Sequence, residues 1–136
     1  MMISTKGRYA LRVVLDLAEN GGDRYVPLSD IARRQAISEK YLESIVALLG
    51  KHKLLESMRG KGGGYRLNRA PEAYTVAEIV LAAEGSFAPV ACLEADADVC
   101  ERAMECRTVK LWAELYRRIQ DYLGSITVAD VLEGKI

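Results

Sequence analysis

The chain has 136 residues, of which half are hydrophobic, so we expect one domain, or one domain with a dimerisation arm. No apolar run approaches the ~20 residues that cross a bilayer, and no signal-peptide hydrophobic region opens the chain, so we expect a cytoplasmic protein. The odd number of cysteines argues against a disulfide scaffold. A single histidine, with no paired carboxylates and no cofactor fingerprint, makes an enzyme the least expected class.

The zero net charge conceals two oppositely charged halves. Residues 1–70 hold 13 Lys and Arg against 7 Asp and Glu, a net charge of +6, and residues 71–136 hold 6 against 12, a net charge of −6. A basic half predicts contact with a polyanion, although chance clustering of solvated charges is the alternative. We therefore expect a DNA-binding domain over residues 1–70 and a sensor and dimerisation region over residues 71–136.

Two helices are predicted at the start of the chain. Ser4 or Thr5 can cap a helix whose apolar side chains recur at helical spacing until the Asn20–Asp23 turn. Ser29 can cap a short second helix that ends near Gln35.

A third helix is predicted after a turn at residues 36–38, with Ser38 as its cap and a stop near Gly50. Its apolar stripe consists of Leu42, Ile45, Val46 and Leu49. Two short helices separated by about three turn residues fit a helix-turn-helix, whose second helix can enter the major groove of DNA.

A β-hairpin with a basic, glycine-rich tip comes next. Residues 54–58 and 65–67 are short β-prone runs, and Arg59-Gly60-Lys61-Gly62-Gly63-Gly64 between them combines charge with glycines that permit a tight turn. The Lys-Ser or Lys-Thr ending of a nucleotide-binding loop is absent, while a plain flexible turn remains as the alternative. Because a helix-turn-helix followed by a hairpin is a winged helix, the predicted fold class is mainly α with a small β-hairpin wing.

The acidic half is predicted to hold helices over residues 75–83, 108–123 and 127–132, with an irregular segment over residues 86–107. The long helix has more apolar surface than a small winged helix can cover. We expect it to pair with its twin in a two-fold dimer, which also suits two DNA half-sites. The alternative is that it packs back onto its own domain. The expected dimerisation residues are Trp112, Leu115, Tyr116, Ile119, Tyr122 and Leu123.

Three segments supply the residues that we expect to contact DNA. Glu43 can accept a hydrogen bond from a cytosine N4, although an ordinary solvated position is the alternative. Arg59 can enter a narrow minor groove. Side chains near the start of the first helix are expected at phosphates, because a helix N-terminus attracts anions. The full set is Lys6, Arg8, Tyr9, Ser38, Glu39, Lys40, Tyr41, Glu43, Arg59, Gly60, Lys61, Gly62 and Gly63.

The irregular segment holds all three cysteines, spaced as Cys92-x7-Cys100-x5-Cys106. Thiolates are standard ligands of iron–sulfur clusters, whereas Cys₄ zinc sites use closely paired cysteines, which are absent here. A cluster normally needs four protein ligands, and the sequence offers no fourth cysteine and only one histidine, His52. Three thiols outside any cluster, or a thiol-based redox switch, are the alternatives.

Several motifs match a known group of proteins. They are Lys6-Gly7-Arg8-Tyr9-Ala10, Ile37-Ser38, Tyr41-Leu42-Glu43, Arg59-Gly60-x-Gly62-Gly63-Gly64-Tyr65, the cysteine segment before Trp112, and Ser125-Ile126-Thr127-Val128 with Leu132. Together they cover nearly the whole chain and resemble the IscR/NsrR/CymR type of bacterial winged-helix regulators (the Rrf-two family), above all its three-cysteine IscR-like branch. The resemblance implies a homodimer that binds operator DNA. It also implies an iron–sulfur cluster, 2Fe–2S or 4Fe–4S, held by Cys92, Cys100 and Cys106.

The chain departs from that family at the fourth cluster ligand. The histidine that IscR proteins carry three residues after the last cysteine is Val109 here, and the first-helix carboxylate of NsrR-like proteins is Arg8. A carboxylate of the acidic segment, or a non-protein ligand, would have to serve. The candidate carboxylates are Asp96, Asp98, Glu101 and Glu105. We expect the dimer to act as a repressor. Gain, loss or oxidation of the cluster would reshape the segment 86–107 and the adjacent dimer helices, and so change the spacing or freedom of the two DNA-binding domains. The rival is a CymR-like regulator without a cluster, which responds to a thiol or small-molecule signal and acts partly by docking onto a cysteine-metabolism enzyme.

Overall fold

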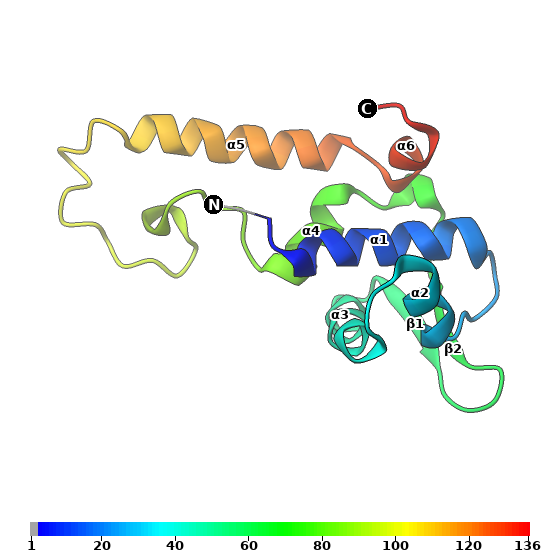
Figure 1. The fold of residues 1–136 in the computed structure, drawn as a ribbon. Helices are drawn as coiled ribbons and strands as arrows, with labels where there is room; N and C mark the ends of the chain where they lie inside the picture. The colour runs from blue at the N-terminus through cyan, green and yellow to red at the C-terminus, as the bar shows by residue number, and fades with distance from the viewer. Residues whose placement is uncertain (1–2) are drawn as a thin grey trace.

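The computed structural model describes residues 3–136 as helices with one β-hairpin. Its elements are α1 (Thr5–Asn20), α2 (Leu28–Gln35), α3 (Glu39–Lys51), β1 (Leu55–Met58), β2 (Gly64–Leu67), η1 (Pro71–Ala73), α4 (Val76–Glu84), η2 (Ala91–Leu93), α5 (Val109–Ser125) and α6 (Val128–Glu133). Figure 1 shows α2, α3 and the hairpin on one side of α1 and the long helix α5 on the other. A helix-turn-helix followed by an antiparallel two-stranded wing confirms the predicted winged-helix fold class.

One hydrophobic core joins the DNA-reading helices to the second half of the chain. The predicted stripe of α3 is fully buried against the apolar face of α1. Tyr74, Ile79 and Val128 belong to the same core, so residues on both sides of residue 70 share it. Burying each large aliphatic side chain contributes about 1.5–3 kcal/mol. Helices α4 and α6 therefore stabilise the winged helix directly.

A buried ion pair fixes α2 against α1. Asp16 is only 2% exposed, and Arg34 grips its carboxylate with Nη2 at 2.7 Å from Oδ1 and Nε at 3.0 Å from Oδ2. Gln35 donates to the same carboxylate at 2.8 Å, and Arg12 donates to both the side chain and the backbone carbonyl of Gln35. A charge this buried is tolerated because it is paired and hydrogen-bonded. The network holds the end of α2 against α1, immediately before the turn that leads into α3.

Three predicted helix caps are wrong in detail. Ser4 occupies the N-cap position of α1, but its side chain does not accept the capping hydrogen bond. Ser29 lies inside α2, which begins one residue earlier behind Pro27, a residue whose fixed φ suits the turn into a helix. Thr108 precedes α5 without a side-chain cap, because its hydroxyl lies beside the sulfur of Cys106 instead.

Helix α5 packs on its own chain with one apolar face and exposes a neighbouring one. Tyr116, Ile119 and Leu123 pack against a second apolar cluster on α4, as the alternative interpretation of this helix expected. A neighbouring face, about a quarter turn around the helix, leaves Leu111 60%, Leu115 39% and Tyr122 59% exposed. Residues 86–107 are irregular apart from η2, as predicted, and Figure 1 shows them looping out past the start of α5. Within residues 3–136, no helix combines the length and apolarity needed to cross a membrane.

Candidate nucleic-acid interface

The turn before α3 is fixed by three neighbouring residues. Ala36 adopts a left-handed conformation at φ 54°, which costs a non-glycine residue about 1–2 kcal/mol. The buried side chain of Ile37 anchors the turn in the core. Ser38 then caps α3 as predicted, accepting the N–H of Tyr41 at 3.1 Å. The first turn of α3 is thereby held with Ser38, Glu39, Lys40 and Glu43 exposed.

Tyr41 and Tyr9 join the recognition helix to α1. Their rings meet edge to face with centroids 5.7 Å apart, and both side chains are partly buried against the core. The Arg12 guanidinium lies 5.1 Å from the centroid of the Tyr9 ring. Sequence reasoning did not single out Arg12, although its position one turn after Arg8 on a basic helix face was a usable signal.

The start of α1 carries the basic side chains that we expected there. Lys6 is partly exposed and Arg8 is exposed, with Arg8 Nη2 3.3 Å from the hydroxyl of Thr5. The backbone N–H groups of Ser4 and Gly7 are already hydrogen-bonded to the carboxylate of Glu84. A phosphate at this end would therefore depend on the side-chain charges rather than on those two N–H groups.

The glycines of the wing serve the hairpin's own geometry. Gly60 and Gly62 have positive φ angles of 90° and 77°, which allow the tight turn. A Cβ on Gly63 would lie 2.2 Å from the Met58 carbonyl oxygen, and one on Gly64 would lie 2.1 Å from the Val26 carbonyl oxygen. The glycines are thus required by a defined backbone conformation, whereas a merely flexible turn would not need them at these positions.

The position of Val26 explains why residue 64, the last of the run, is glycine. Its backbone exchanges two hydrogen bonds with Tyr65, at 2.8 and 2.9 Å, so the segment before α2 is bridged to β2. Only glycine lets the two backbones approach so closely at position 64. The wing is therefore tied to the entrance of the helix-turn-helix.

The positive charge of the wing tip comes from Arg59 and Lys61, which are both exposed. Arg66, the third basic residue of the motif, is engaged elsewhere: its Nε lies 2.8 Å from Glu56, and its guanidinium lies 4.4 Å from the centroid of the Tyr25 ring. Figure 1 shows the tip and α3 projecting on the same side of α1, away from α5.

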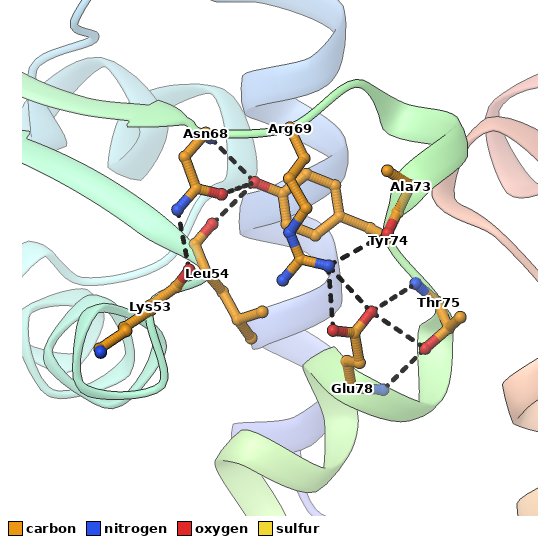
Figure 2. A network of polar contacts seen from close by, with 8 residues as sticks. All are labelled: Lys53, Leu54, Asn68, Arg69, Ala73, Tyr74, Thr75 and Glu78. Carbon is orange, nitrogen blue, oxygen red and sulfur yellow. Dashed lines mark hydrogen bonds and ion pairs between the residues drawn. The ribbon is translucent and has the colours of Figure 1, made fainter.

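A polar network at the base of the wing anchors it to α4. The buried Tyr74 hydroxyl lies 2.8 Å from the Leu54 carbonyl and 2.8 Å from the Asn68 side-chain oxygen, and it accepts the Asn68 N–H at 2.9 Å (Figure 2). Burial raises the pKa of this phenol. The ring also lies beneath Arg69, with the guanidinium 4.5 Å from its centroid.

Arg69 continues the network to the start of α4. It pairs with Glu78 at 3.0 Å, and Glu78 closes the predicted capping box with Thr75 (Figure 2). Partial burial alone would raise the pKa of Glu78, but the hydrogen bonds from Thr75 and Arg69 outweigh it and lower that pKa. The base of the hairpin is thus joined to the start of α4 by hydrogen bonds and an ion pair.

The cysteine segment is open to solvent. Cys92 and Cys100 are exposed and Cys106 is half-buried. The hydrogen bond with the Thr108 hydroxyl and the N–H groups of Thr108 and Val109 lower the pKa of the Cys106 thiol. Across residues 3–136, no three His, Cys, Asp or Glu side chains come together as metal ligands. The candidate carboxylates at 96, 98, 101 and 105 are all exposed.

Comparison with known proteins decides the family. A profile of the Rrf2 family, described as an iron-dependent transcriptional regulator, matches residues 3–134. This chain is a member of the Rrf2 family. The Rrf2 chain is 38% identical over 135 residues to the HTH-type transcriptional regulator IscR of Erwinia tasmaniensis, a match that spans 99% of this chain and 81% of that relative.

Solved structures of the same kind share the fold of this Rrf2 protein. CymR, the global cysteine regulator of B. subtilis, matches with a TM-score of 0.78 at 34% identity, covering 96% of this chain and 95% of CymR. The IscR of T. potens matches with a TM-score of 0.76 at 37% identity, covering 100% and 89%. The Rrf2 protein is therefore a DNA-binding transcriptional regulator of the IscR type, and the expectation that it is not an enzyme is confirmed.

Proposed function

We propose that this Rrf2 protein is a homodimeric repressor that binds a roughly palindromic operator, with α3 in the major groove and the wing tip in the adjacent minor groove. The observation that carries the proposal is the projection of α3 and the hairpin on the same side of α1 (Figure 1). The first turn of α3 is exposed there, and so are Arg59 and Lys61 of the wing. The charge of residues 1–70 supports it, because non-specific DNA affinity comes mainly from phosphate neutralisation. A regulator of this kind acts in the cytoplasm.

The exposed face of α5 supports the dimer. Leu111, Leu115 and Tyr122 form an apolar strip that its own chain leaves uncovered. Two-fold pairing through this strip would place two recognition helices for two half-sites. Tyr116, Ile119 and Leu123, which pack against the cluster on α4, would then lie beside the interface.

The proposal is tested by selecting sequences from a random duplex library with the purified protein. We expect enrichment of an inverted repeat whose half-sites lie about one or two helical turns apart, bound by two chains per duplex. Binding that never enriches a sequence, or a single chain per duplex at saturation, would contradict it. Size-exclusion chromatography with light scattering gives the dimer independently.

The segment 86–107 is the sensor in this proposal, and an iron–sulfur cluster is the cofactor that the IscR-type relatives suggest. The donor chemistry of three thiols suits such a cluster. The arrangement of the described residues does not, because no three ligands converge and neither familiar fourth ligand is present. Anaerobic purification followed by iron and sulfide analysis decides the matter: stoichiometric iron and sulfide support the cluster, and their absence leaves the thiols as the sensor.

A thiol-based, CymR-like regulator is the second candidate, and Cys106 favours it. A half-exposed thiol with a lowered pKa at the start of a helix has the features of a redox-responsive cysteine. In this version the dimer also docks onto a cysteine-metabolism enzyme. Steep loss of DNA affinity with salt in the absence of any partner would favour direct regulation over docking.

A further inference from the structure

The last residue of α4 holds the first turn of α1. Glu84 Oε1 accepts the backbone N–H of Ser4 at 2.8 Å, the hydroxyl of Ser4 at 2.7 Å and the backbone N–H of Gly7 at 3.1 Å. The first N–H groups of a helix have no partner within it, and a local Ser side chain usually supplies one. Here the acceptor comes from a helix 80 residues away along the chain. Figure 1 shows the C-terminal end of α4 beside the start of α1.

Position 7 is shaped by this contact. A Cβ on Gly7 would lie 2.4 Å from Glu84 Oε1 and 3.0 Å from its Cγ. Gly7 lies in the helical conformation of α1, where alanine would favour the helix more than glycine does. The glycine is therefore explained by the approach of the carboxylate and not by a turn.

Glu84 also stands at the junction between the two functional regions of the chain. Gly85 ends α4 in a left-handed conformation, and the segment 86–107 with all three cysteines follows at once. On the other side of the contact, the first turns of α1 carry Lys6 and Arg8, and Tyr9 touches the recognition helix through Tyr41. One carboxylate thus connects the cysteine segment to the DNA-facing helices.

We propose that Glu84 is a positioning residue that transmits the state of the cysteine segment to the DNA-facing start of α1. When the segment pulls or rotates the end of α4, the carboxylate leaves Ser4 and Gly7, and the first turn of α1 loses its cap. Lys6 and Arg8 then lose their fixed placement over the operator. This inference rests on the proposed function, since it requires both operator binding and a responsive cysteine segment. Coupling of this kind needs an element with two arrangements that both sites bias.

The test compares operator affinity before and after alkylation with N-ethylmaleimide. All three cysteines of the chain lie in the segment 86–107, so the reagent modifies only that segment. The variant is Glu84→Gln, and the matched control is Glu19→Gln, which removes the same charge from the exposed last turn of α1. We expect alkylation to change the affinity of the wild-type protein and of Glu19→Gln by about fivefold or more. In Glu84→Gln, the affinities before and after alkylation should be nearly equal.

The outcomes separate the two claims. If the wild-type protein binds no operator, the proposed function fails and the coupling fails with it. If it binds its operator with an affinity that alkylation does not change, operator binding stands, and the sensor role of the cysteine segment and the coupling are overturned. If the wild-type protein responds and Glu84→Gln responds equally, only the role of Glu84 is overturned. Circular dichroism of each variant establishes that the fold is retained.

Amide hydrogen exchange supplies a readout that does not depend on DNA. In the untreated protein we expect slow exchange at Gly7, and faster exchange after alkylation. Gly7→Ala should speed exchange of the Ser4 N–H even though alanine favours the helix, because its Cβ displaces the carboxylate. Unchanged exchange at Gly7 after alkylation would overturn the inference, and so would a Ser4 N–H that stays protected in Gly7→Ala.

Discussion

The ring of Tyr9 on α1 meets the ring of Tyr41 on α3 edge to face, at an interplanar angle of 84° and a centroid separation of 5.7 Å. The two residues come from segments that we expected to touch DNA independently, at phosphates and in the groove. Their contact instead makes the start of α1 and the first turn of the recognition helix one rigid surface. Arg12, stacked on Tyr9 and hydrogen-bonded to Gln35, extends that surface to α2.

Removing the Tyr9 ring is therefore expected to affect both stability and DNA binding. Tyr9→Ala should lower the free energy of unfolding by about 2 kcal/mol, because it deletes a half-buried ring and an aromatic pair. Operator affinity should fall as well, since α3 loses its lateral support. Tyr9→Phe keeps the ring and serves as control. Denaturant unfolding and fluorescence anisotropy measure the two effects, and an equal loss of stability in Tyr9→Phe would show that the hydroxyl and not the ring matters.

Glu43 and Lys40 are both exposed on α3, but we expect them to contribute differently to DNA binding. Glu43 should affect sequence preference, and Lys40 should affect affinity for any sequence. Glu43→Ala should relax the preference for one base pair by about 1 kcal/mol or more, because a carboxylate can pair with a cytosine N4 donor and repels other edges. Lys40→Ala should weaken binding to all sequences alike, as expected of a phosphate contact. Competition with operators mutated at each position distinguishes them. If Glu43→Ala and the wild-type protein show the same relative affinities for the mutated operators, Glu43 contacts no base and is an ordinary solvated residue.

Gly64 is expected to be the least replaceable glycine of the wing. Alanine at this position needs φ 148° and would place its Cβ 2.1 Å from a backbone oxygen that cannot rotate away. We expect Gly64→Ala to cost about 3 kcal/mol of stability. Gly50→Ala in α3 is the control, because its Cβ meets nothing within 4 Å, and it should stabilise the protein by about 0.5–1 kcal/mol. Equal melting temperatures for the two variants would show that the wing does not depend on the Val26 bridge.

Cys106 should react as a thiolate at lower pH than an ordinary cysteine. Its pKa is lowered from the ordinary value of a thiol, first by the hydrogen bond with the Thr108 hydroxyl and then by backbone N–H groups. A lowered thiol pKa means that more thiolate is present at neutral pH, so the rate of iodoacetamide alkylation should rise through a lower pH midpoint in the folded protein than in denaturant. Thr108→Val should move that midpoint upward. The measurement uses a protein with Cys92 and Cys100 replaced by Ser, and coinciding midpoints in the folded and unfolded states would refute the assignment.

Features that depend on near neighbours could be predicted from the sequence. The caps at Ser38 and Thr75 bond within three residues, and the α3 stripe follows helical spacing, so their residue types alone identify them. The winged-helix order follows from the same local signals. Ser29 failed as a cap because Pro27 already fixes the backbone where the helix begins.

Contacts between distant segments could not be predicted in the same way. Nothing near Ser4 indicates that Glu84 will cap its helix, and the need for glycine at position 64 depends on the path of Val26. The apolar residues of α5 extend around more than one face, so periodicity could not divide them between its own α4 and a partner. The thirteen expected DNA-contacting residues stay a prediction, and the structure adds Arg12 to the residues worth testing.

Reversing the charge of Arg59 tests the central claim, that this Rrf2 protein reads DNA with its recognition helix and its wing. Arg59 is exposed at the tip, and it takes part in neither the Val26 bridge nor the Tyr74 hydrogen bonds that anchor the hairpin. Operator affinity is measured over a series of salt concentrations for the wild-type protein, Arg59→Glu and the control Lys135→Glu at the far end of the chain. We predict an affinity loss of about tenfold or more for Arg59→Glu, with a salt dependence shallower by about one phosphate contact, and no change for the control. An Arg59→Glu protein that binds its operator like the wild type at every salt concentration would contradict the account.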